Sequence, residues 1–196
     1  MVSEKVRVGV LISGRGSNMA ALIEAAKAED YPAEIALVVS NKADAAGLGR
    51  ARAEGVEAMA IRAKDFADRD AFEAAIDAEL RARGVRIVCL AGYMRILGPA
   101  FVERWRGRMI NIHPSLLPAY KGLHTHERAL ADGVSEHGCT VHLVTPELDD
   151  GEILAQARVP VLPGDDADKL AARVLAEEHR LFPRALASLA RSIAAT

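Results

Sequence analysis

The segment that most constrains the fold is a short apolar strand that runs directly into a glycine-rich loop. Residues 6–12 are rich in β-branched side chains, and the loop 13–18 that follows reads Ser-Gly-Arg-Gly-Ser-Asn. Met19, Leu22 and Ile23 then recur at helical spacing. This order predicts a strand, a tight loop and a helix. The free backbone amides at the start of such a helix form a site for an anion of phosphate size.

The sequence of this loop leaves a second interpretation open. It is neither a full GxGxxG sequence nor a Walker loop, because the Walker lysine is absent, so it indicates no particular nucleotide. Ser17 and Asn18 would add side-chain donors to an anion site. Alternatively, a Ser or Asn side chain caps the helix and no ligand binds.

Strand and helix patterns alternate along the rest of the chain. Apolar runs predict strands at 34–40, 56–61, 85–91, 138–144 and 153–161, and helical spacing predicts helices at 65–83 and from 125 to about 133. The run 85–91 is wholly apolar, as expected of a parallel strand covered on both faces. We therefore predict an α/β fold with an open, mostly parallel, doubly wound (Rossmann-like) sheet, in a single domain over residues 1–196. A closing helix or helix pair over 165–190 is expected to break at Pro183.

Composition excludes several classes of function. The net charge is −2 and no segment is dense in Lys or Arg, which argues against a nucleic-acid partner. No apolar run approaches the ~18 residues of a membrane helix. Cys89 and Cys139 are not in a CxxC pair, which is typical of buried thiols in a reducing compartment. We expect a cytoplasmic enzyme, monomer or homodimer, with no membrane partner.

One further strand carries polar groups at its end. Asn111 and His113 lie two residues apart in an apolar run that stops at Pro114. Residues two apart on a strand face the same side, so both side chains are expected to enter one cleft. An amide that stabilises an oxyanion beside a base that moves a proton suits acyl transfer. The alternative is an Asn in a turn and a His satisfied by a backbone carbonyl.

Other histidines suggest a metal site. His124 and His126, with His113 and His142, are candidate zinc ligands. No acidic or thiolate ligand stands beside them at metal-site spacing, and His-Thr-His at a helix start is equally a capping or substrate-contact arrangement. We therefore predict no metal. His142 is interpreted as a polar residue that lines the cleft, and the acidic turn 145–151 as a solvated hairpin loop or part of the site.

Together these motifs resemble one known family. The matching segments are 13–18 (SGRGSN), 40–44 (SNKAD), 91–97 (AGYMRIL), 111–118 (NIHPSLLP), 122–126 (GLHTH) and 147–149 (ELD), in the order and spacing of the phosphoribosylglycinamide formyltransferases. The resemblance covers essentially the whole chain. It implies the formyltransferase fold and transfer of the formyl group of 10-formyltetrahydrofolate, a co-substrate, to the amine of glycinamide ribonucleotide in purine biosynthesis.

The resemblance also implies roles for individual residues. Asn111, His113 and Asp149 would be catalytic, with Asn111 as oxyanion donor, His113 as proton shuttle and Asp149 charging and orienting it. His113 ends one strand and the acidic turn follows the next strand, so both loops are expected to open at the same rim of the sheet. The ribonucleotide phosphate would be held by Arg15, Gly16, Ser17, Asn18 and Glu178. The folate would contact Arg69, Met94, Arg95, Ile96, Leu97, Asn111, Thr145, Pro146, Glu147, Leu148 and Asp149.

Three positions depart from the family pattern. Lys121 stands where proline is frequent, Asp150 lies in a turn that is usually richer in glycine and proline, and Leu175 replaces a polar residue. The rival functions are a methionyl-tRNA formyltransferase, a formyltetrahydrofolate deformylase and a non-catalytic nucleotide- or nicotinamide-binding module. The first two would need a further domain, and the last gives no reason for the three catalytic residues.

Overall fold

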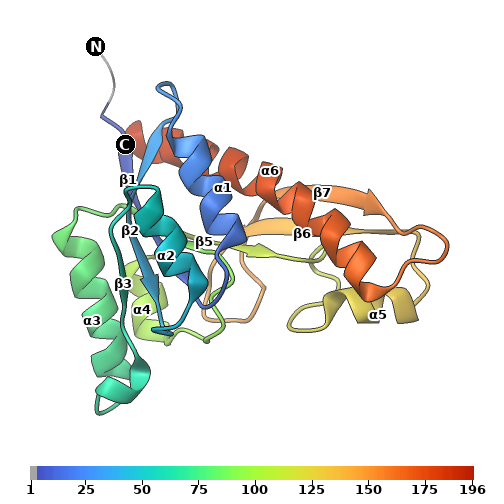
Figure 1. The fold of residues 1–196 in the computed structure, drawn as a ribbon, viewed down its shortest axis with the longest axis horizontal. Coiled ribbons are helices and arrows are strands. Elements are labelled where there is room, and N and C mark those ends of the chain that lie inside the picture. Colours follow the sequence, from blue (N-terminus) through green and yellow to red (C-terminus); the bar gives the residue numbers. More distant parts are fainter. Residues whose placement is uncertain (1–3) are drawn as a thin grey trace.

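The computed structural model describes residues 4–196, and one seven-stranded sheet runs through them in the order β3-β2-β1-β4-β5-β6-β7 (Figure 1). The strands are β1 Val6–Ile12, β2 Ala33–Ser40, β3 Ala58–Ala60, β4 Ile87–Leu90, β5 Met109–His113, β6 Glu136–Leu143 and β7 Ile153–Pro160. The helices are α1 Ser17–Ala26, α2 Ala46–Ala53, α3 Arg69–Ala82, α4 Pro99–Arg104, α5 Thr125–Ala131 and α6 Ala167–Ala194, with a 3-10 turn at Ala63–Asp65. The first five strands are parallel, and β6 runs against both β5 and β7. The predicted open, mostly parallel, doubly wound sheet is confirmed.

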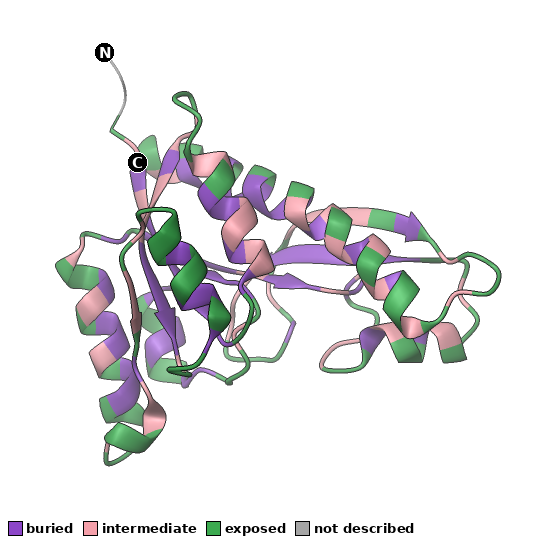
Figure 2. Cartoon of the chain, viewed as in Figure 1, coloured by how far each residue is buried: buried purple, intermediate pink, exposed green. Residues whose placement is uncertain are grey.

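Two hydrophobic cores lie on the two faces of the sheet. Helices α1, α2 and α6 cover one face, and α3 and α4 cover the other. The central strands are almost wholly buried between these layers (Figure 2). Both cysteines are free and buried, and burial raises the pKa of Cys139 to about 12. The predicted inert thiols are confirmed.

Two helix boundaries differ from the sequence prediction. Asp68 caps α3 by accepting from the amide of Ala71, so the helix begins at Arg69 and not at residue 65. Helix α6 continues through Pro183 without the predicted break. A proline in a helix costs about 3 kcal/mol, and here ten buried residues along α6 offset that loss by packing on the sheet.

No helix in residues 4–196 is long and apolar enough to span a membrane.

Candidate active site

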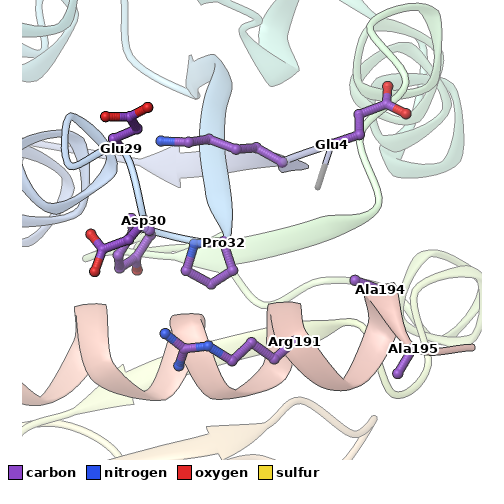
Figure 3. A pocket seen from close by; sticks show the side chains of 9 residues that line it. Glu4, Glu29, Asp30, Pro32, Arg191, Ala194 and Ala195 are labelled. Carbon is purple, nitrogen blue, oxygen red and sulfur yellow. The ribbon is translucent and has the colours of Figure 1, made fainter. Parts of the chain in front are cut away.

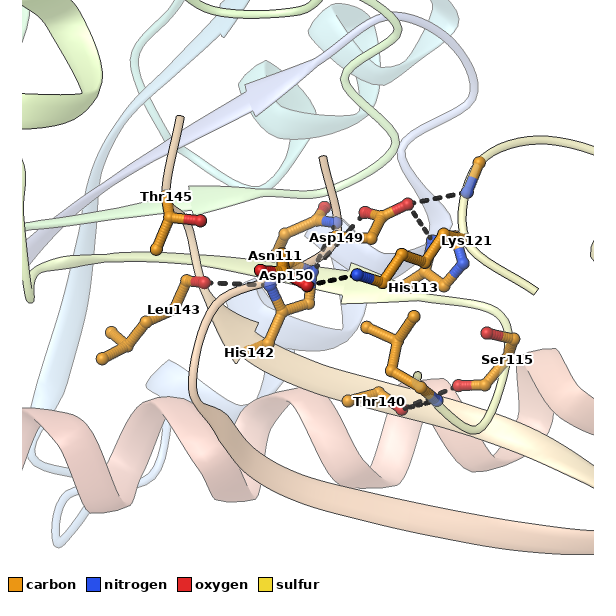
Figure 4. Close-up of polar contacts among 12 residues, drawn as sticks. Asn111, His113, Ser115, Lys121, Thr140, His142, Leu143, Thr145, Asp149 and Asp150 are labelled. Atoms are coloured by element: carbon orange, nitrogen blue, oxygen red, sulfur yellow. Dashed lines mark hydrogen bonds and ion pairs between the residues drawn. The ribbon is translucent and has the colours of Figure 1, made fainter. Parts of the chain in front are cut away.

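Strand β5 delivers the amide and the imidazole that the sequence singled out. Asn111 and His113 are on the same side of the strand (Figure 4). His113 lies next to the carboxylate of Asp149, and Asn111 lies next to His142, which is itself close to Asp149. His113 is buried, and Asn111 is half-buried. The prediction that these two side chains face the same side of the strand is confirmed.

Asp149 reaches the strand by a different route from the one expected. The sequence argument placed the loops after β5 and β6 at a shared rim, as in a parallel sheet, and this is wrong because β6 is antiparallel, with Leu143 opposite Ile110. The loop between β6 and β7 folds back, and Asp149 adopts a left-handed conformation with φ 49°. Its Oδ2 then lies 3.5 Å from Nδ1 of His113 and accepts from the amide of Gly122 at 2.8 Å. The predicted proximity of Asp149 to His113 is confirmed, although the reason given for it, a shared rim of parallel strands, is wrong.

His142 completes this group, and the sequence analysis assigned it no role beyond lining the cleft. Its Nδ1 donates to the carbonyl of Leu143 at 2.9 Å, which leaves Nε2 as an acceptor for the amide Nδ2 of Asn111 at 3.2 Å. Burial lowers the pKa of His142, which favours this neutral ring. The distance of 3.7 Å from Nε2 to Asp149 is therefore a contact and not an ion pair. The sequence alone could not identify this partner of Asn111, because the pairing of Asn111 with His142 depends on the register between β5 and β6.

Both ring nitrogens of His113 have partners. Nε2 donates to the carbonyl of Tyr120 at 2.9 Å, because a carbonyl can only accept. Nδ1 faces the carboxylate of Asp149, which would accept from an N–H at that position. The surroundings can therefore hold a ring that carries a hydrogen on both nitrogens.

The glycine loop forms a separate part of the candidate site. Gly16 has φ 71° and precedes α1, which begins at Ser17 without a side-chain cap. The amide of Gly47 donates to the carbonyl of Gly14. A Cβ on Gly47 would lie 3.0 Å from that carbonyl oxygen and 3.3 Å from the Cα of Gly16, so a larger residue would crowd the loop. Because neither Ser17 nor Asn18 caps the helix, the capping-only alternative does not describe this loop.

Three side chains surround the start of α1. The Nδ2 of Asn18 donates to Glu178 at 3.0 Å, and Oδ1 of Asn18 is buried without a partner in the described part of the chain. Burial raises the pKa of Glu178 to about 6, and the bond from Asn18 opposes this rise. Arg50 donates to the carbonyl of Arg15 at 3.2 Å, so its charge lies beside the loop. Arg50 was not predicted, because nothing in its local sequence marks it.

The loop between β4 and α4 exposes apolar side chains at the same edge of the sheet. Met94 is 63% exposed and Ile96 is 73% exposed. Leu97 is buried in the core, so it can meet a ligand only through its backbone. The guanidinium of Arg95 lies 5.2 Å from the centre of the Phe72 ring.

Two further segments contribute to the predicted folate contacts. Leu148 is 55% exposed, and Thr145, Pro146 and Glu147 lie on the same loop as Asp149. Arg69 begins α3, with its Nε 3.1 Å from the position that a Cβ on Gly98 would occupy. The structure thus brings Arg69 to the end of the exposed apolar loop.

Two of the remaining histidines are paired with each other, and a third is exposed. Nδ1 of His126 lies 3.2 Å from Nε2 of His137, and burial lowers the pKa of His137 to about 4. His124 is exposed and occupies the N-cap position of α5, but its side chain makes no capping hydrogen bond. Among residues 4–196, no group of three or more His, Cys, Asp and Glu side chains is arranged to hold a metal ion.

A surface hollow of about 830 Å³ lies at the opposite edge of the sheet (Figure 3). It is lined by Lys5 before β1, by Asp30 and Pro32 before β2 and by Arg191 of α6. Lys5 already donates to the carbonyls of Ala26 and Ala28. In doubly wound sheets, ligands bind outside the carboxyl ends of the strands, and this hollow is at the amino ends.

The fold and the Asn111, His113 and Asp149 group together define a class of protein. An open α/β sheet with these side chains at one edge is the arrangement expected of a formyl transferase. A family model described as formyl transferase matches residues 6–186, and the chain belongs to this family.

Particular relatives are similar over most of the chain. Phosphoribosylglycinamide formyltransferase of Escherichia coli K12 is 48% identical over 178 residues, which are 91% of this chain and 84% of that protein. The trifunctional purine biosynthetic protein adenosine-3 of Drosophila melanogaster is 50% identical over 96% of this chain, and the chain spans 14% of its length. A crystal structure of phosphoribosylglycinamide formyltransferase from Brucella melitensis is 56% identical, with a TM-score of 0.93 over 95% of this chain and 96% of that one.

Proposed function

We propose that this chain transfers the formyl group of 10-formyltetrahydrofolate to the amine of 5'-phosphoribosylglycinamide, a step of purine biosynthesis. The observation that carries the proposal is the contact of His113 and Asp149 next to Asn111, at one edge of a sheet that also presents the glycine loop. The names of the relatives support the choice of substrates.

Asn111 is proposed to stabilise the oxyanion. When the amine attacks the formyl carbon, a carbon–nitrogen bond forms and the carbonyl oxygen becomes negative. One hydrogen on Nδ2 of Asn111 is used by His142, and the second remains for this oxygen. His142 thereby fixes the direction in which the amide donates.

His113 and Asp149 are proposed to manage the proton. The attacking amine must lose a proton, and the folate nitrogen must gain one when its bond to the formyl carbon breaks. A ring with hydrogens on both nitrogens can give one to the folate nitrogen once its bond to the Tyr120 carbonyl or to Asp149 opens. The same ring nitrogen can then take up the proton that the amine loses. Asp149 orients the ring and balances its charge.

The ribonucleotide is proposed to bind along the glycine loop. The backbone amides that begin α1, with Arg15, Gly16, Ser17 and Asn18, suit the phosphate. Glu178 was assigned to the phosphate by resemblance, but a carboxylate repels a phosphate. We place Glu178 against the ribose hydroxyls instead, because hydroxyls donate to carboxylates.

The folate is proposed to lie across the two loops that expose apolar side chains. Met94 and Ile96 on one side and Leu148 on the other are large apolar side chains that are exposed. A ring system bound between them would bury this surface. Arg69 suits the carboxylates of the glutamate tail.

One assay tests this function directly. The purified chain is incubated with 10-formyltetrahydrofolate and with or without 5'-phosphoribosylglycinamide, and tetrahydrofolate and the formylated ribonucleotide are measured by mass spectrometry. Both products should appear only when both substrates are present. Tetrahydrofolate released equally without the ribonucleotide would indicate a hydrolase and contradict the proposal.

Binding of each substrate separates the two halves of the site. Ser17→Ala and Asn18→Ala should each weaken ribonucleotide binding by roughly 10- to 150-fold, since a hydrogen bond to a charged group contributes about 1.5–3 kcal/mol. Folate-analogue binding in calorimetry should change little. Equal losses for both ligands would contradict the division of the site.

A further inference from the structure

The hydroxyl of Ser13 occupies a junction between two loops of the site. Ser13 follows β1 directly and is 4% exposed. Its Oγ accepts from the backbone amide of Met94 at 2.8 Å and donates to Oδ1 of Asn41 at 2.6 Å. These directions are fixed, because a backbone amide only donates and an amide oxygen only accepts. One hydroxyl therefore links the loops that follow three strands.

The three strands bring these loops to the same level. β1 lies between β2 and β4, with Ile12 opposite Ser40 and Leu11 opposite Leu90. Asn41 follows Ser40 directly, and the apolar loop of Met94 begins just after Leu90. The link is therefore built at one edge of the sheet, between the glycine loop and the loop proposed to bind the folate.

Packing on the other side limits how the glycine loop can move alone. The carbonyl of Gly14 accepts from Gly47, and Gly16 packs on the backbone of Gly47. The segment proposed to bind the phosphate begins at Arg15, two residues after Ser13. If a ligand makes this segment more rigid, Ser13 should become more rigid too, because the short stretch between them is held against α2.

In the described part of the chain, two side chains form hydrogen bonds to the backbone of the apolar loop. Ser13 bonds to it at Met94, and the buried Glu73 accepts from the amide of Gly98 at 2.8 Å at the other end. Met94 and Ile96 between these points are exposed. Ser13 is the one of these two anchors that belongs to the segment leading into the phosphate site.

We infer that Ser13 is a positioning residue that couples the two ligand sites, so that the ribonucleotide and the folate each strengthen the binding of the other. The inference rests on the proposed function. A phosphate that orders the glycine loop also fixes Ser13, and Ser13 fixes the amide of Met94. The second ligand then meets a loop that is already ordered, and by linkage the effect is equal in both directions.

Calorimetry of a folate analogue with and without saturating 5'-phosphoribosylglycinamide tests this coupling. In the wild-type protein the analogue should bind at least about threefold more tightly when the ribonucleotide is present. In Ser13→Ala this ratio should fall to one, and it should do so in Asn41→Leu, where a half-buried side chain loses the acceptor. Asn41→Asp keeps an acceptor oxygen, so the ratio of the two affinities should stay at its wild-type value. A general loss of affinity would affect both measurements equally and leave the ratio unchanged.

Glu73→Ala is the matched control. It releases the other end of the same loop, so it should weaken the folate analogue equally with and without the ribonucleotide and leave the ratio at its wild-type value. A wild-type ratio of one, or an unchanged ratio in both Ser13→Ala and Asn41→Leu, would overturn the coupling. A wild-type protein that bound neither ligand would instead overturn the proposed function, and the coupling with it.

Discussion

The glycine loop and the loops around Asp149 are held in place by different kinds of contact. The glycine loop packs backbone against backbone, with Gly16 and Gly47 in contact. The loops around Asp149 depend on side chains and on residues other than glycine in left-handed conformations, namely Tyr120 at φ 54°, His124 at φ 56° and Asp149 at φ 49°. Such residues are uncommon and require support from their surroundings.

This difference suggests a division of tasks. The phosphate needs backbone amides at a fixed place, which a strand, a glycine turn and a helix supply locally. The proposed proton transfer needs His113 and Asp149 together, from two separate segments. We expect substitutions near the glycine loop to change binding and substitutions near Asp149 to change turnover.

Replacement of Asp149 should have the largest effect. Asp149→Asn keeps the shape but removes the charge that faces Nδ1 of His113. We expect kcat to fall by about a hundredfold or more, with both ligands still bound in calorimetry, because the group acts on the proton.

The neighbouring residue provides the control for this substitution. Asp150→Asn should keep wild-type kcat within about threefold, because Asp150 is exposed and contacts Lys121 rather than the histidines. Wild-type turnover in Asp149→Asn together with a large loss in Asp150→Asn would place the catalytic carboxylate one residue later.

The two regions should also respond to pH with opposite sign. His137 near α5 has its pKa lowered from 6.5 to about 4, so its contribution to stability is complete above pH 6.5 and is lost as the pH falls toward 4. This amounts to roughly 3 kcal/mol. Glu178 beside the glycine loop has its pKa raised from 4.5 to about 6, so its contribution is present below pH 4.5 and is lost as the pH rises through 6, by roughly 2 kcal/mol.

Single substitutions should reveal these two slopes, which oppose each other in the wild-type protein. Denaturant unfolding between pH 4 and 7 should show a flatter loss toward low pH in His137→Gln and a flatter loss toward neutral pH in Glu178→Gln. The comparison uses the slope and not the overall stability, which either substitution can lower. Unchanged slopes in both variants would contradict the assigned causes.

The close contact of the glycine loop predicts a smaller effect. A Cβ on Gly47 would lie 2.5 Å from Cδ1 of Ile12 and 3.0 Å from the carbonyl oxygen of Gly14. Gly47→Ala should therefore lower the free energy of unfolding by about 1–3 kcal/mol and weaken ribonucleotide binding. Gly49→Ala in the same helix meets no atom within 4 Å and should stabilise the protein by about 0.5–1 kcal/mol. Equal effects at the two positions would show that the contact has no energetic importance.

The two regions also differ in how far the sequence predicted them. The strand 6–12, the glycine loop and the following helix depend on local periodicity and on glycine. The strand has the predicted bounds, and the helix begins at Ser17, inside the loop predicted at 13–18. The contact with Gly47 could not be predicted from local pattern, because Gly47 is distant in sequence, and Glu178 was assigned to this region only through the resemblance. The proximity of Asp149 was predicted through resemblance, but its route was wrong, since local pattern does not specify whether β6 is parallel or antiparallel to β5. His142 was undervalued for the same reason.

The last and smallest effect concerns two residues that depart from the family pattern, Lys121 and Asp150, which form an ion pair with each other. The carboxylate of Asp150 accepts from Lys121, and this bond lowers the pKa of Asp150. Lys121 lies between Tyr120, whose carbonyl accepts from His113, and Gly122, whose amide donates to Asp149. The pair therefore joins the two catalytic loops at residues adjacent to the site, and both side chains remain partly exposed.

An exposed ion pair contributes little and is screened by salt. We expect Lys121→Asp, which places two carboxylates together, to lower kcat by about two- to threefold at low ionic strength. The exchange of both residues, Lys121→Asp with Asp150→Lys, should restore kcat, and 0.5 M salt should reduce the difference between the variants, since the Debye length then falls to roughly 4 Å. If the double exchange were no better than Lys121→Asp at low salt, the charge pair would not hold the loops. The left-handed residues and the bond from Gly122 to Asp149 would then be sufficient to position the carboxylate.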